Sequence, residues 1–115
     1  VLGNRQGIMR TGFFGFPMDD AFIITALDFG GRAYLQYEGS FRRRYCGDLD
    51  MDLVEIFFEA FTRGAQCNLI IKQLSGKNDH HIVECMFKSL GKSLRMALSR
   101  DFRRQDQIPS SKGVI

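Results

Sequence analysis

Residues 79–99 form a long segment with helical periodicity, and this segment limits the possible folds more than any other part of the sequence. Its apolar residues recur every three or four positions, which places them on one face of a helix. They are Val83, Met86, Phe87, Leu90 and Leu94. Asn78 or Asp79 can serve as the N-cap of this helix. Because a helix with one apolar face must cover an apolar surface, the remainder of the chain has to provide such a surface.

The polar face of the same predicted helix carries both histidines of the chain. At about 100° per residue, His80, Glu84 and Lys88 follow one stripe, with His81 beside it. Two consecutive helical residues more naturally bind two different metal ions than chelate one. Each ion would then have at most two ligands from this helix, so a metal site here implies ligands from elsewhere or from another chain. On spacing alone, a polar surface is the commoner explanation of such a pair.

The segments upstream predict a sheet for this helix to cover. Strands are predicted at residues 9–16, 21–29, 32–38 and 67–74 from their β-branched and aromatic content. A turn at residues 17–20 separates the first two strands. The glycine pair at positions 30 and 31 predicts an antiparallel hairpin between the second and third.

A second helix is predicted between the third and fourth strands. Acidic residues open it at 47–52, and Gly64 lies just beyond its last turn as a cap. Phe57, Phe58 and Phe61 are predicted to be core residues. The resulting order is βββαβα. It indicates an α+β two-layer sandwich with both helices on one face of a largely antiparallel sheet.

Composition limits the class of protein. A chain of 115 residues with 44% apolar residues predicts a single domain spanning 1–115. The net charge of +3 is too small to indicate a nucleic-acid partner, and only the Arg42-Arg43-Arg44 run favours that alternative. Three widely spaced cysteines predict no disulfide framework and favour a cytoplasmic location. No apolar run is long enough to span a membrane, so we expect no membrane partner.

Several short motifs occur together in this chain. They are His80-His81-Ile82-Val83-Glu84, Pro109-Ser110-Ser111-Lys112-Gly113, Pro17-Met18-Asp19-Asp20, and the segments 7–12 and 27–35. Together they resemble the imidazoleglycerol-phosphate dehydratases over nearly the whole chain. The resemblance implies the second of two repeats, in the ribosomal protein S5 domain 2-like class. Residues 1–7 would be the tail of the preceding repeat, and 103–115 would be a C-terminal loop.

The resemblance also implies an activity. Family members are metal-dependent hydro-lyases that dehydrate imidazole glycerol phosphate to imidazole acetol phosphate in histidine biosynthesis, with two Mn²⁺ ions per site. By this resemblance His80, His81 and Glu84 are metal ligands, and the substrate phosphate is bound by Arg10, Arg32, Lys88, Ser111 and Lys112. It implies a homo-oligomer, for which a homodimer is the natural expectation. The general base is unassigned, with Asp19, Asp20 and Glu55 as candidates for supporting roles.

The chain departs from the family pattern at two positions. Family members commonly carry histidines where this sequence has Ile56 and Ile70, and isoleucine cannot bind a metal. Asp20 also stands where the family usually has the longer glutamate. The isolated repeat is therefore expected to be an inefficient enzyme. The alternative is a non-catalytic assembly module of the same fold, in which metal binding has decayed.

Overall fold

The computed structural model describes residues 7–101. The predicted order of the larger elements is confirmed, with a short hairpin added before the first helix. The elements are β1 (Thr11–Met18), β2 (Ala21–Asp28), β3 (Tyr34–Glu38), β4 (Tyr45–Cys46), β5 (Leu49–Asp50), α1 (Asp52–Ala65), β6 (Asn68–Ser75) and α2 (Asp79–Leu98). Within the described residues, no helix is long and apolar enough to cross a bilayer.

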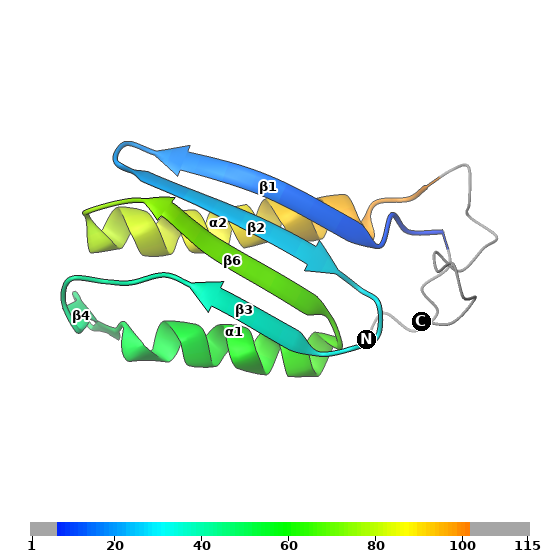
Figure 1. Ribbon diagram of the computed structural model, residues 1–115, viewed down its shortest axis with the longest axis horizontal. Helices are drawn as coiled ribbons and strands as arrows, with labels where there is room; N and C mark the ends of the chain where they lie inside the picture. The colour runs from blue at the N-terminus through cyan, green and yellow to red at the C-terminus, as the bar shows by residue number, and fades with distance from the viewer. Residues whose placement is uncertain (1–6, 102–115) are drawn as a thin grey trace.

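Two layers make up the domain. The four longer strands form one sheet in the order β1-β2-β6-β3. Figure 1 shows α2 running behind the sheet and α1 running beside β3. α2 packs on β1 and β2, whereas α1 packs on β3. The predicted α+β two-layer sandwich is therefore confirmed, and the two-stranded β4-β5 hairpin lies outside the main sheet.

The predicted hairpin between the second and third strands is wrong. β2 and β3 are not neighbours, because β6 lies between them, antiparallel to β2 and parallel to β3. Gly31 does adopt a positive φ of 91°, so the chain turns there. However, residues 29–33 cross the width of the intervening strand, a distance of two strand spacings or about 10 Å. The sheet is therefore mixed. In this central position β6 has hydrogen-bond partners on both of its edges.

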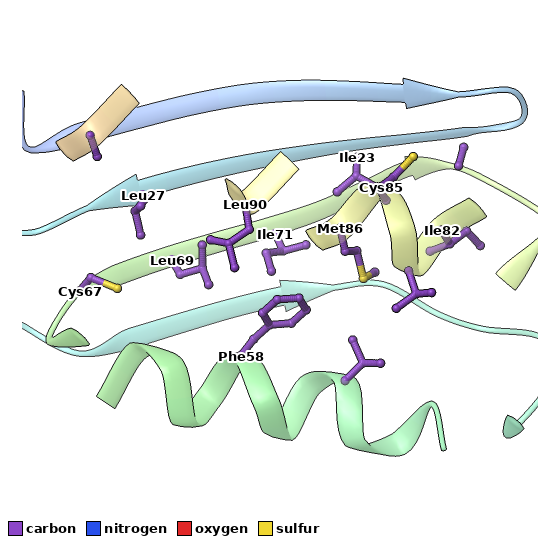
Figure 2. Close-up of a cluster of buried hydrophobic side chains, with 14 of the residues drawn as sticks. Ile23, Leu27, Phe58, Cys67, Leu69, Ile71, Ile82, Cys85, Met86 and Leu90 are labelled. Carbon is purple, nitrogen blue, oxygen red and sulfur yellow. The ribbon is translucent and has the colours of Figure 1, made fainter. Parts of the chain in front are cut away.

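The core lies between the sheet and the helices. Alternate residues of β2 and β6 face the helix layer, as the period of a strand requires. Figure 2 shows Phe58 of α1 pointing into the same cluster as Leu69 and Ile71 of β6. Ile82, Cys85 and Met86 of α2 are fully buried in this cluster as well. Each helix therefore packs its apolar face on the sheet and leaves its polar face outside.

Two predicted features of the helices are corrected. Phe58 is buried and Phe61 is partly buried, but Phe57 is 47% exposed. Phe57 lies on the outer side of the helix layer, where its ring contacts that of Phe87 at 5.3 Å between centroids. α1 also continues through Gly64 to Ala65, and its C-cap is Gln66, which takes the left-handed conformation with a φ of 54°.

A close seam joins β1 to α2. A Cβ atom on Gly12 would lie 2.0 Å from the carbonyl oxygen of Ser93, so only glycine fits there. Farther along the seam, the Ser89 hydroxyl donates to the Phe14 carbonyl at 3.0 Å. The Ser93 hydroxyl donates to the carbonyl of Thr25 at 3.2 Å. Small side chains on α2 thus bring its backbone close to the sheet and fix the position of the helix along the strands.

Candidate functional site at the start of α2

The first turn of α2 is held by two side chains of its own N-terminus. The Asn78 side chain accepts a hydrogen bond from the His81 N–H at 3.2 Å, so Asn78 is the N-cap. The Asp79 carboxylate accepts the backbone N–H groups of Arg42 and Arg43 at 2.9 and 3.0 Å. This second link ties the arginine-rich loop to the helix start. It was not foreseen, because residues about 36 positions apart give no periodic signal in the sequence.

His80, Glu84 and Lys88 form a continuous polar stripe on α2. His80 Nε2 lies 3.0 Å from Glu84 Oε1, and Lys88 Nζ lies 2.9 Å from Glu84 Oε2. The hydrogen bond from Lys88, together with the neighbouring His80, lowers the pKa of Glu84 below its usual value. Glu84 is therefore an ionised carboxylate that an imidazole and an ammonium share along one face of the helix.

His81 is held from the β1–β2 turn. Its Nδ1 lies 2.6 Å from Asp20 Oδ1, while Asp20 Oδ2 accepts the backbone N–H groups of Lys77 and Asn78. The pKa of Asp20 lies far below its usual range, first because of the hydrogen bond from the Asn78 N–H and then because of those from His81 and the Lys77 N–H. In turn, the hydrogen bond to Asp20 raises the pKa of His81. Asp19 is more distant, with its Oδ2 3.7 Å from His81 Nε2.

The donor atoms at the start of α2 are of a kind that suits Mn²⁺. Imidazole nitrogens and carboxylate oxygens both bind such divalent ions. The rings of His80 and His81 have centroids 6.2 Å apart and are inclined at 65°. Among residues 7–101, however, no three histidine, cysteine, aspartate or glutamate side chains converge as a metal-binding group. One chain thus supplies suitable donors in too small a number to close a site.

Arg10 and Arg32 lie at the other end of the sheet. Arg10 has a φ of 76° and places its guanidinium on Asp28, with Nε–Oδ1 and Nη2–Oδ2 distances of 2.6 and 3.1 Å. This hydrogen bond to Asp28 raises the pKa of Arg10. Its backbone N–H donates to the carbonyl of Ala97, near the end of α2. Arg32 is exposed in the loop that follows β2.

The two groups of predicted site residues are well separated. His81 is paired with the β1–β2 turn, whereas Ala97 is bonded to Arg10 before β1 begins. The sixteen residue steps from His81 to Ala97 correspond to about 24 Å of helix. Lys88 lies between the two groups, about 12 Å along the helix from His80. Ser111 and Lys112 fall outside the described residues.

The remaining positions singled out in the sequence do not join either group. Ile56 is 60% exposed on α1. Ile70 is 37% exposed on β6. It alternates with the buried Leu69 and Ile71, so it faces away from the helix layer. Glu55 is exposed on α1. The burial of Tyr37, and after it the charge of Glu55, raises the pKa of Tyr37 to about 12.

Comparison with known proteins decides the family. The imidazoleglycerol-phosphate dehydratase family matches residues 1–94. The chain belongs to this family. It is 46% identical over all 115 residues to an imidazoleglycerol-phosphate dehydratase from Thermosynechococcus vestitus, covering 55% of that protein. It is 40% identical over the same length to the one from Koribacter versatilis, covering 59% of it. The chain thus spans somewhat more than half the length of these relatives.

Solved structures of family members share the fold. The imidazoleglycerol-phosphate dehydratase of Staphylococcus aureus superposes with a TM-score of 0.84 at 31% identity, covering 87% of this chain and 59% of the other. The Pyrococcus furiosus enzyme in complex with (S)-C348 gives a TM-score of 0.85 at 33% identity, covering 98% of this chain and 61% of the other. The half-repeat fold inferred from the sequence is confirmed by these two superpositions.

Proposed function

We propose that this chain supplies one half of a composite site that dehydrates imidazole glycerol phosphate to imidazole acetol phosphate in histidine biosynthesis. The observation that carries the proposal is the polar stripe on α2, in a chain of this family. The donors for Mn²⁺ are His80 and Glu84 of this stripe and the adjacent His81. A biosynthetic role of this kind is consistent with the cytoplasm, where we expect the protein to act.

A second copy of the chain is the simplest source of the missing groups. About 24 Å of helix separates the two groups of site residues, more than a small phosphorylated imidazole can span. Within residues 7–101 the metal donors are also too few to close a site. Both deficits are removed together if the start of α2 in one copy faces Arg10 and Arg32 of another. A symmetric homo-oligomer provides such a pairing twice for each pair of copies.

Each residue then has a definite task. His80, His81 and Glu84 would hold the metal ion, which would supply a Lewis acid for the imidazole ring of the substrate. Lys88, about two turns from His80 on the same helix face, would bind the phosphate end of the substrate after releasing Glu84, which its Nζ atom now contacts at 2.9 Å. The guanidinium groups of Arg10 and Arg32 bind phosphate oxygens in the partner-contributed part of the site. To bind phosphate, Arg10 has to release the Asp28 carboxylate, which its guanidinium now holds through two nitrogen atoms.

A dehydratase assay with paired variants tests this arrangement. His81→Ala removes the metal side of the site, and Arg32→Ala removes the phosphate side. Each variant alone is expected to lose activity at least 100-fold, whereas a refolded mixture of the two regains part of it, because mixed assemblies contain some sites with both sides intact. An inactive wild-type chain, or unchanged activity after His80→Ala and Glu84→Ala, would overturn the proposed site.

A non-catalytic assembly module is the second candidate. Ile56 and the incomplete donor set favour it, because both weaken metal binding. Such a module self-associates without any metal requirement. A mass that changes when a chelator is added would exclude it, whereas an unchanged mass together with an inactive wild-type chain would favour it.

A further inference from the structure

The two histidines at the start of α2 differ in exposure and in the ring nitrogen that has a partner. The His80 side chain is 67% exposed and touches Glu84 through its Nε2 atom. The His81 side chain is 27% exposed, and its Nδ1 atom is held by Asp20. This second contact ties one ring nitrogen of His81 to a residue 61 positions earlier in the chain.

Asp20 is itself fixed from two sides. Its Oδ2 accepts two consecutive backbone N–H groups, those of Lys77 and Asn78, and the latter is 2.8 Å away. This grip leaves Oδ1 directed at His81. Asp20 also lies in the turn directly before β2, after Asp19, whose φ of 49° makes the tight turn from β1. The carboxylate thus has little freedom to move away from the imidazole.

The chemistry of this contact determines which nitrogen carries the proton. An ionised carboxylate accepts hydrogen bonds and donates none. The 2.6 Å contact therefore requires a hydrogen on His81 Nδ1. In the neutral ring the other nitrogen, Nε2, then has a free lone pair. A second partner that fixes the tautomer and orientation of a ligating histidine is a recurrent feature of metal sites.

We propose that Asp20 is the positioning residue for His81, holding its Nδ1–H so that Nε2 is presented to a divalent metal ion. The metal part of this inference rests on the proposed function, whereas the tautomer does not. His80 has a different geometry, with its Nε2 atom already beside the Glu84 carboxylate. A metal ion at His80 would thus replace an existing contact, whereas one at His81 would meet an Nε2 atom whose neighbouring carboxylate, that of Asp19, lies 3.7 Å away.

Nitrogen NMR of the metal-free chain tests the tautomer directly. At about pH 9, above the ordinary range of histidine pKa values, we expect the neutral ring of His81 to carry its proton on Nδ1 in the wild-type chain. Asp20→Ala should shift the ring toward the Nε2–H form. Asp19→Ala is the matched control, since it removes the neighbouring carboxylate without touching Nδ1.

The wild-type spectrum decides the proposal even if Asp20→Ala does not fold. An Nε2–H tautomer in the wild-type chain would overturn it, as would an unchanged tautomer in folded Asp20→Ala. Mn²⁺ titration provides the second readout, for which we expect Asp20→Ala to weaken binding about 10- to 100-fold. A wild-type chain that holds the Nδ1–H tautomer but binds no Mn²⁺ would contradict the proposed function and leave the positioning role of Asp20 standing.

Discussion

The two ends of the sheet use charged residues in different ways. At the histidine end, formed by the β1–β2 turn and the start of α2, the carboxylate of Asp20 accepts two backbone N–H groups and contacts His81, all within residues 77–81. At the arginine end, formed by the start of β1 and the end of α2, Arg10 is paired with one carboxylate, that of Asp28. Figure 1 shows these two regions at opposite ends of β1 and α2. The first end is organised around a histidine nitrogen, and the second around the guanidinium of Arg10 on the Asp28 carboxylate.

The seam between β1 and α2 keeps the two ends apart, and breaking it should have the largest effect. Gly12→Ala places a Cβ atom against the carbonyl of Ser93, so we expect a loss of about 3 kcal/mol in the free energy of unfolding. Chemical denaturation measures this loss. Gly91→Ala on the open side of the same helix is the control, with an expected gain of up to about 1 kcal/mol. Equal effects at both positions would contradict the close approach at Gly12.

The sequence predicted where the helices and strands lie along the chain better than it predicted which strands are neighbours in the sheet. Period and capping signals located both helices, because those signals are local. The Gly30–Gly31 pair is equally local, but it could not reveal that β6 would enter between β2 and β3. Phe57 and Phe58 are adjacent aromatic residues of one helix, and only the sheet position decides which of them is buried.

The candidate site shows the same division. The stripe of His80, Glu84 and Lys88 follows from helical spacing and is present. The hold of Asp20 on His81 depends on two distant segments that meet only in the folded chain. The separation of Arg10 from the histidines is likewise a property of the whole sheet, so no motif in the sequence predicts it.

A pH series should reveal the ion pair at the histidine end. The pKa of Asp20 is lowered, so its contribution to stability is present above its ordinary value of about 3.9 and is lost as the pH falls below that value. The pKa of His81 is raised, so its contribution is present below about 6.5 and is lost as the pH rises through the raised value. Asp20→Asn should therefore lower the thermal midpoint most between about pH 4 and 6.5, by a few degrees.

Asp48→Asn serves as the control for this series. Asp48 is exposed in the turn between β4 and β5 and is not among the charged groups that raise the pKa of His81. Its substitution should shift the thermal midpoint by a similar small amount at every pH. A pH-independent difference for Asp20→Asn would show that the ion pair with His81 adds nothing beyond the capping of the two backbone N–H groups.

The smallest effect is expected at the arginine end. The Arg10 and Asp28 side chains are 26% and 32% exposed, so solvent screens their attraction. Arg10→Gln should lower the free energy of unfolding by no more than about 1 kcal/mol. Because the histidines lie about 24 Å away along the helix, the Nδ1–H tautomer of His81 should be unchanged. A changed tautomer in Arg10→Gln would show that the two ends are coupled within one chain.

The most direct test of the composite site is the number of Mn²⁺ ions bound per chain, measured together with molecular mass. The chelator-stripped chain is titrated with Mn²⁺ while light scattering records its mass. We predict saturation near one ion per chain, accompanied by a mass of at least a dimer, because one chain alone has too few donors. His81→Ala should abolish this binding. Tight binding to a monomer, or no binding at any mass, would contradict the account.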